Sequence, residues 1–88
     1  MIERQDLRAK RERKALFKLL EMGKERRRRT YNKIIKSLIN EGIDQAHASL
    51  ILAKMIEKGI LRKKGIYYHK VIYEIDVKAL ERLLETEE

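Results

Sequence analysis

The chain has no cysteine, no proline and no tryptophan, and only four of its 88 residues are glycine. Without cysteine it forms neither a disulfide nor a thiolate metal site, which favours a cytoplasmic protein. No apolar run approaches the roughly 18 residues that a membrane span needs, and the N-terminal segment lacks the apolar stretch of a signal peptide. We therefore expect neither export nor membrane insertion.

Groups for catalysis or metal binding are equally scarce. His47 and His69 are the only histidines, no serine lies in a nucleophile motif, and no glycine-rich phosphate loop is present. The carboxylates near the C-terminus have helix-surface spacing and no adjacent histidine, which does not suggest a metal cluster. The sequence therefore predicts no enzyme, no cofactor, no metal and no small-molecule substrate.

Positive charge, by contrast, is abundant. Lys and Arg number 22 against 14 Asp and Glu, a net charge of +8, while 43% of the residues are hydrophobic. Such a chain is long enough for one modest core and a single domain over residues 1–88. A basic surface attracts phosphates, which favours a nucleic-acid partner. The abundance of Lys, Glu, Arg and Ile is typical of thermophile proteins.

A long first helix is predicted between Glu3 and Met22, because no glycine or proline interrupts that segment. Its first half has only Leu7 and Ala9 as apolar residues, so residues 1–14 are predicted to form a basic helical extension. Its second half is apolar and is expected to enter the core. Gly23 is predicted to end the helix.

Two shorter helices are predicted next. Thr30 is a candidate N-cap for a helix that Gly42 ends, and Asp44 is a candidate N-cap for a helix that Gly59 ends. The connection "EGID" between them is very short, which is typical of a helix-turn-helix. The first of the two carries an apolar stripe at helical spacing: Tyr31, Ile34, Ile35, Leu38 and Ile39.

In the helix after Asp44 the residues divide into two faces. The core-facing set is Ala48, Ile51, Leu52, Met55 and Ile56. The outward-facing set is Ala46, His47, Leu50 and Lys54.

The segment from Ile60 to Asp76 is rich in Ile, Val and Tyr and has a basic middle that contains Gly65. This predicts a β-hairpin with a charged tip. Asp76 is expected to cap a final helix in residues 77–88, whose apolar stripe comprises Val77, Leu80, Leu83 and Leu84.

The succession of helix, helix, turn, helix, hairpin and helix, with Leu52 and Met55 followed by "EKGIL", resembles a winged helix-turn-helix domain of the small archaeal or archaeal-virus type. The resemblance covers roughly residues 14–76. It implies a mainly α fold with a small β-hairpin. It also implies that the helix after Asp44 enters the DNA major groove and that the hairpin, or wing, follows the backbone or the minor groove.

On the helix implied to enter the major groove, the candidate contacts are Gln45, His47, Ser49 and Lys54. Gln45 could pair with adenine, and Lys54 suits a phosphate. No arginine lies on this helix, however, and Leu50 points outward. Leu50 could touch thymine methyl groups, a partner protein or the chain's own N-terminal extension.

The hairpin offers more cations. A basic hairpin can bind phosphates, and its tyrosines can donate to phosphate or stack on bases. Alternatively, the tyrosines belong to the core face and the lysines solvate an edge strand. The candidate contacts are Arg62, Lys63, Lys64, Tyr67, Tyr68, His69 and Lys70.

Four consecutive arginines, Arg26, Arg27, Arg28 and Arg29, precede Thr30 and Tyr31. We expect them in the loop before the second helix, where they and the helix N-terminus could clamp a phosphate. Four cations at a helix N-terminus oppose the helix dipole when no anion is bound. The alternative is a solvated loop.

A homodimer is expected through the terminal helices, with Leu7, Leu80, Leu83 and Leu84 at the interface. The alternative is that the last helix folds back beside Leu16 and Leu20. The leading hypothesis is a double-stranded DNA-binding protein, either a small transcriptional regulator or an architectural factor. The alternatives are a winged helix that binds a protein within a larger assembly, and an RNA- or ribosome-binding protein.

Overall fold

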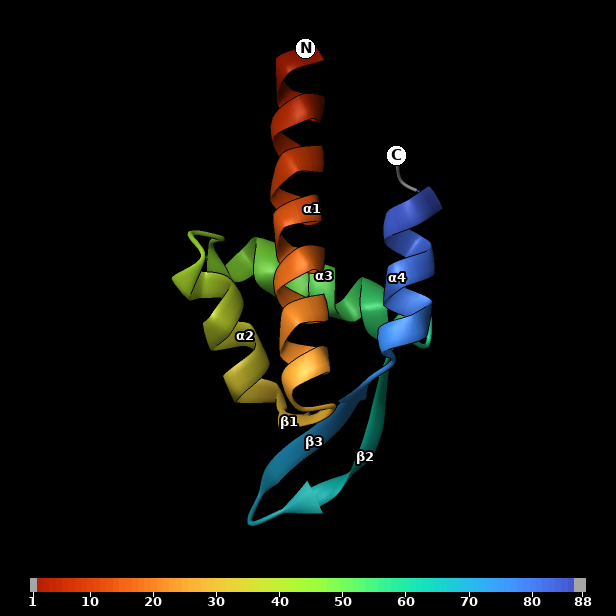
Figure 1. Cartoon of the computed structure of the whole chain (residues 1–88). Helices are drawn as coiled ribbons and strands as arrows, with labels where there is room; N and C mark the ends of the chain where they lie inside the picture. Colours follow the sequence, from red (N-terminus) through yellow and green to blue (C-terminus); the bar gives the residue numbers. More distant parts are fainter. Residues whose placement is uncertain (1, 87–88) are drawn as a thin grey trace.

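The computed structural model describes residues 2–86, with side chains for residues 10–86, as a mainly helical fold with one small antiparallel sheet (Figure 1). Helix α1 and the β2–β3 hairpin project from opposite ends, which gives the molecule extents of 44 × 25 × 22 Å. In chain order the elements are α1 (Ile2–Glu25), β1 (Arg28–Thr30), α2 (Tyr31–Asn40), α3 (Gln45–Glu57), β2 (Leu61–Tyr67), β3 (Lys70–Ile75) and α4 (Val77–Thr86).

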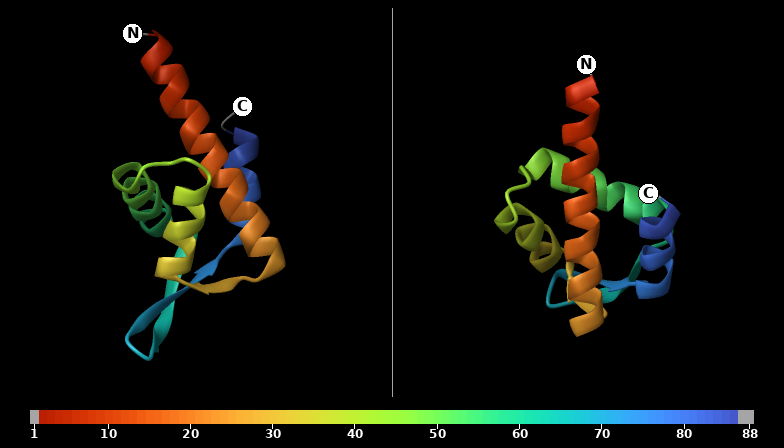
Figure 2. Two further views of the ribbon diagram at one scale, coloured as in Figure 1. Left: turned by 90° about the vertical axis from the view of Figure 1, so that its left-hand side faces the viewer. Right: turned by 45° about the horizontal axis from the view of Figure 1, so that its top comes forward.

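The core lies between the C-terminal half of α1, the α2–α3 pair, the root of the hairpin and α4 (Figure 2). The predicted core positions are confirmed except at Ile39, Ile56 and Phe17 of α1, which are 39%, 37% and 49% exposed. No helix among the described residues has both the length and the apolarity for crossing a membrane. The buried residues are Ala15, Leu16, Leu19, Met22, Ile34, Leu38, Ile43, Ala48, Ile51, Leu52, Met55, Ile60, Leu61, Ile75, Leu80 and Leu84.

Helix α1 continues past Gly23 to Glu25, so the prediction that Gly23 ends it is wrong. Gly23 is buried, and a Cβ atom there would lie 2.9 Å from Cγ2 of Ile75 and 3.0 Å from Cγ2 of Val77. The residue is therefore required for close packing of α1 on the end of β3 and the start of α4, and not for a turn.

Residues Arg28–Thr30 form strand β1, which corrects the assignment of Arg28 and Arg29 to a loop. The strand pairs with β3 in the register Arg28 to Glu74 and Thr30 to Ile72, which gives the sheet order β1-β3-β2. No alternation of apolar and polar side chains marks these three residues as a strand. Their extended shape comes from hydrogen bonding to β3, a partner more than forty residues away in the sequence.

The connection between α2 and α3 has the capping residues and the glycine that the sequence predicts. Thr30 caps α2 by accepting a hydrogen bond from the backbone N–H of Lys33 at 3.3 Å. Gly42 follows the end of α2 with φ of 93°, a left-handed conformation that favours glycine. Asp44 takes the N-cap position of α3, but its carboxylate makes no hydrogen bond to a backbone N–H there.

The hairpin turns at Tyr68 and His69, not near Gly65, so the prediction of a charged tip is wrong. Gly65 lies within β2 beside an irregularity in the pairing, where the register shifts between Lys63 and Gly65. The cations of "RKK" therefore lie along the root of the hairpin, and its end is aromatic.

Helix α4 folds back onto α1, which is the alternative to the predicted dimer contact. Asp76 caps it by accepting a hydrogen bond from the N–H of Ala79 at 3.1 Å, as predicted. Leu80 is fully buried and Leu84 is 6% exposed in the chain's own core, so the assignment of these two to a dimer interface is corrected. Leu83 is partly buried against the same core. Leu7 lies outside the described side chains.

Candidate nucleic-acid interface

A hollow of about 410 Å³ opens between the N-terminus of α2 and the outer face of the sheet. Five cationic side chains and no carboxylate line it, and they come from three separate segments: the β1 strand with the residue pair before it, the first turn of α2, and β2. We call this feature the basic hollow. Its lining residues are Arg26, Arg28, Arg29, Thr30, Lys33, Lys64, Gly65, Ile66, Tyr67 and Ile72.

The charge around the basic hollow is only partly balanced. Glu74, on the central strand β3, lies 3.3 Å from Arg28, 3.9 Å from Lys64 and 4.0 Å from Arg62. Arg62 also contacts Asp76, at 3.2 Å. One carboxylate shared by several cations orients them but leaves an excess of positive charge beside the hollow.

The four-arginine run divides into two pairs with different roles. Arg26 and Arg27 are exposed and have no acidic partner among the described residues. Arg28 is paired with Glu74. Arg29 is only 17% exposed at its side chain and donates hydrogen bonds to the carbonyls of Met22 and Arg26 at 3.2 and 3.3 Å. Arg29 therefore satisfies carbonyl groups at the end of α1, which is a structural role.

The N-terminus of α2 carries a basic residue that sequence reasoning did not single out. Lys33 lines the basic hollow, and Lys36 follows it at helical spacing on the exposed side of α2. Their spacing opposite the apolar stripe was the signal that could have identified them. Thr30 accepts from the N–H of Lys33, and its hydroxyl proton is still available to an anion.

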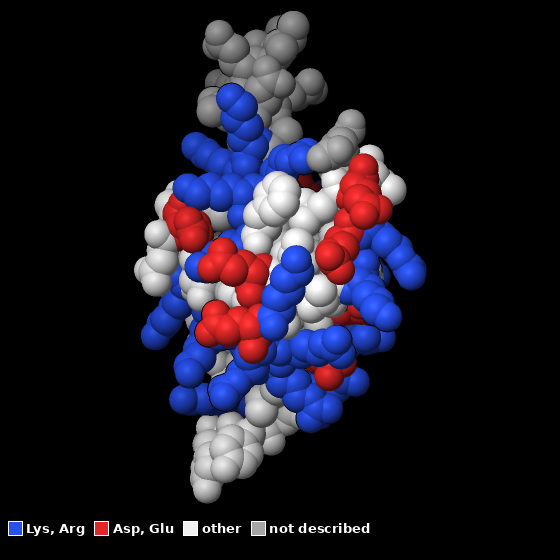
Figure 3. Space-filling model, viewed as in Figure 1, with Lys and Arg blue, Asp and Glu red and all other residues white. Residues whose placement is uncertain are grey.

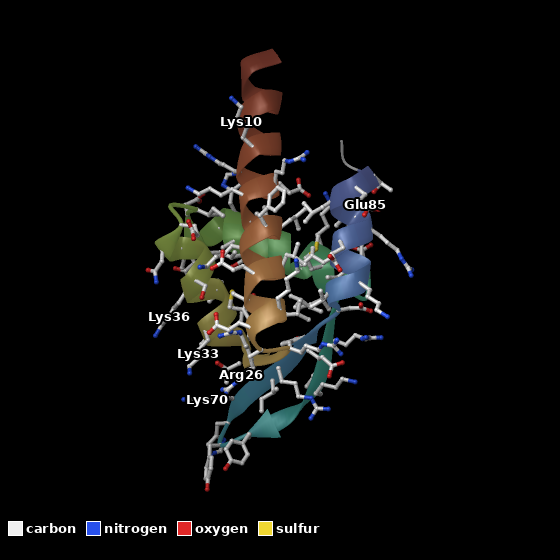
Figure 4. All side chains as sticks on the ribbon, viewed as in Figure 1. Lys10, Arg26, Lys33, Lys36, Lys70 and Glu85 are labelled. Carbon is white, nitrogen blue, oxygen red and sulfur yellow. The ribbon has the colours of Figure 1, made fainter. Side chains whose placement is uncertain are left out.

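Lys36, Lys33, Arg26 and Lys70 follow one another down one side of the molecule, from α2 to the hairpin (Figure 4). We call these four residues the cationic track. None of them has an acidic partner within the described part of the chain. Cations that lie close together without counter-charges repel one another, and an anion running along the track would relieve that repulsion.

The predicted contacts of the hairpin lie partly at its root and partly at its turn. In the view of Figure 3, Lys and Arg side chains gather at the root, and the end of the hairpin that extends beyond them shows no Lys, Arg, Asp or Glu. Tyr67 and Tyr68 are 63% and 78% exposed, so neither belongs to the core face. Lys63, His69 and Lys70 are also exposed.

Tyr31 is placed differently from the other tyrosine candidates. It is partly buried against the core, and its ring centroid lies 5.9 Å from that of Tyr73. This contact joins the first residue of α2 to the central strand, so the ring itself serves packing.

On α3, the predicted contacts Gln45 and His47 lie in the first turn, and Ser49 is partly covered. His47 Nδ1 lies 2.6 Å from the Asp44 carboxylate. That hydrogen bond holds the pKa of Asp44 below its ordinary value of 3.8. The imidazole is thereby held over the α3 N-terminus and is not directed freely outward.

Lys54, the only Lys or Arg of α3, contacts Glu12 of α1 at 2.8 Å. The pair borders a second hollow of about 260 Å³ between α1 and α3, which Arg11, His47 and Leu50 also line. Leu50 is 68% exposed, so α1 does not cover it. The outward stripe of α3 therefore consists mainly of Ala46, Leu50 and Ala53, which are uncharged.

The structure thus brings the α2 N-terminus, three of the four consecutive arginines and the hairpin together, and it leaves α3 poor in positive charge. In the described part of the chain, no three His, Asp or Glu side chains gather closely enough to hold a metal ion. No protein-family model, curated protein or solved structure matches this chain.

Proposed function

We propose that the protein is a winged-helix protein that binds double-stranded DNA mainly through the phosphate backbone. The order of helices and strands, with β1 joined to the far side of the hairpin, supports the winged-helix assignment. In the left view of Figure 2, α3 and the hairpin turn lie on the same side of the C-terminal half of α1. One DNA duplex could therefore meet α3, the α2 N-terminus and the hairpin together.

The observation that carries the proposal is the cationic track beside the basic hollow. Its members come from α2, from the segment before β1 and from β3, and they lack carboxylate partners in the described structure. The helix dipole and the Thr30 hydroxyl would also stabilise a phosphate bound at the N-terminus of α2. Contacts of this kind give affinity and position but read no sequence.

The stripe of Ala46, Leu50 and Ala53 on α3 presents no group that forms a bidentate hydrogen bond with a base. Gln45 is the exposed residue of α3 best suited to base reading. The proposed activity is therefore closer to that of an architectural factor than to that of a repressor with one strongly preferred site.

The test is duplex affinity as a function of salt concentration, measured by fluorescence anisotropy. The Lys33→Ala/Lys70→Ala variant should bind more weakly by a similar factor on every sequence. Its slope of log affinity against log salt should flatten by roughly 0.9 for each phosphate that the variant no longer neutralises. Arg28 and Arg29 are left intact because both have partners within the fold.

The matched control is Lys78→Ala/Arg82→Ala, which removes the same charge from exposed positions on α4, at the other end of the sheet from the hairpin turn (Figure 1). Equal slopes for the two double variants would contradict the proposal. Competition by double-stranded RNA at the same ionic strength separates DNA binding from RNA binding.

A second candidate function rests on Leu50 and the hollow beside it. Leu50 is 68% exposed and, with Ile51, forms the apolar part of a hollow whose rim is polar, an arrangement that a protein partner could cover. In that case the chain would bind a protein subunit through α3. Absence of duplex binding at low salt would favour this second function.

A further inference from the structure

The end of the hairpin has a backbone conformation that its residues adopt at a conformational cost. Tyr68 and His69 form a two-residue turn with φ of 48° and 64°, between the paired residues Tyr67 and Lys70. Turns with two left-handed residues normally use Asn-Gly or a similar pair, because a side chain disfavours positive φ. Strain of this kind is often found at functional sites.

The side chains at this turn form an exposed aromatic surface. The rings of Tyr67 and Tyr68 meet edge to face, with centroids 4.4 Å apart and planes at 75°. Ile66 next to them is 64% exposed. Each tyrosine ring limits the motion of the other, so the tip presents a firm apolar surface with polar hydroxyl groups. Three neighbouring exposed apolar side chains on so small a protein indicate a binding partner.

The surroundings of the tip point to the chemistry of that partner. On the face shown in Figure 3, lysines and arginines lie across the root of the hairpin, and the end of the hairpin that extends past them shows no Lys, Arg, Asp or Glu. Lys70 pairs with Tyr67 at the base of the turn, and Lys64 lies further toward the root. If both lysines contact phosphates, the turn itself extends past the phosphate backbone. The groups that lie there are bases, and an aromatic ring stacks on the face of any base.

We propose that the Tyr67–Tyr68 tip stacks on unpaired bases, so that the protein binds most tightly where a DNA duplex adjoins unpaired nucleotides. The proposal rests on the duplex binding proposed above. Stacking on an aromatic side chain raises affinity by about fivefold to a hundredfold per base. In an intact duplex that gain is offset, because the base must first leave its own stack. At unpaired bases the gain is retained.

The experiment compares a short duplex with the same duplex carrying a forked end whose unpaired strand contains 2-aminopurine. The wild-type protein should bind the fork at least about fivefold more tightly, and 2-aminopurine fluorescence should fall as the base stacks. Tyr67→Ala/Tyr68→Ala should reduce the ratio of the two affinities to about one. Tyr67→Phe/Tyr68→Phe keeps both rings and should keep the preference, which separates stacking from hydrogen bonding by the hydroxyls.

A second variant tests whether a lower fork preference results from unfolding. Tyr68→Asn/His69→Gly places preferred residues in the turn, so it should melt at a higher temperature than the wild type while its fork preference falls. A more stable variant with a lower preference cannot be explained by unfolding.

The outcomes distinguish this inference from the proposed function. Absence of salt-dependent binding to either DNA would overturn the proposed function and this inference together. Duplex binding without a fork preference, or a preference that the double-alanine variant keeps, would overturn only the tip inference. Binding to mixed phosphatidylcholine and phosphatidylserine vesicles that needs the tyrosines, with no fork preference, would overturn it in favour of a membrane contact.

Discussion

Lys54 of α3 and Glu12 of α1 form an ion pair with 2.8 Å between the ammonium nitrogen and a carboxylate oxygen. The pair ties α3 to the first helix and engages the single Lys or Arg of α3. It therefore reduces the attraction of α3 for a polyanion.

Replacing this carboxylate should strengthen DNA binding. Glu12→Gln removes one acidic partner of Lys54 and one negative charge beside α3, so duplex affinity should rise and the salt slope should steepen by up to roughly 0.9. The free energy of unfolding should fall by less than about 1 kcal/mol, because the pair is partly exposed to solvent. Glu85→Gln, which makes the same charge change at an exposed position of α4, is the control. If both variants bind alike, α3 does not face the DNA.

Single substitutions in the arginine run should have different effects on stability. Arg29→Ala removes the hydrogen bonds to the carbonyls of Met22 and Arg26, so it should lower the free energy of unfolding by about 1 kcal/mol. Arg27→Ala should leave the melting temperature unchanged, because its exposed side chain has no such partner. Thermal unfolding followed by circular dichroism measures both. Equal melting temperatures for the two variants would show that Arg29 has no structural role.

Leu80 should contribute to the stability of the isolated chain. Leu80→Ala opens a cavity in the core between α1 and α4 and should lower the free energy of unfolding by about 2 to 5 kcal/mol. Leu50→Ala, at an exposed site, should change it by less than about 0.5 kcal/mol. Denaturant titrations at two protein concentrations provide the measurement. A midpoint that rises with protein concentration for the wild type, and no longer does so for Leu80→Ala, would restore the dimer assignment.

The hydrogen bond from His47 should be visible in the titration of Asp44. The bond lowers the pKa of Asp44 below 3.8, so His47→Gln should move that pKa upward toward the ordinary value. Because the folded-state pKa is lowered, the stabilising contribution is present above the ordinary aspartate pKa and is lost as pH falls through the folded value. Carbon-13 NMR of the carboxyl groups gives the pKa directly. An unchanged value in His47→Gln would mean that the bond does not form in solution.

Much of the fold follows from local sequence patterns. The apolar stripe of α2, the caps at Thr30 and Asp76 and the glycine after α2 are effects of neighbouring residues, whose spacing along the chain is enough to reveal them. The concentration of positive charge near the α2 N-terminus was also predictable from the arginine run.

Tertiary contacts decided the rest. Strand β1 exists because β3 offers it a hydrogen-bonding edge, and Arg28 and Arg29 differ because the first faces Glu74 while the second faces the end of α1. The pairing of β2 with β3 set the turn at Tyr68 and His69, although Gly65 is the residue that local turn preferences favour. A sequence specifies which groups the chain carries, but distant segments must pack together before a cation gains a partner or is left free to bind an anion.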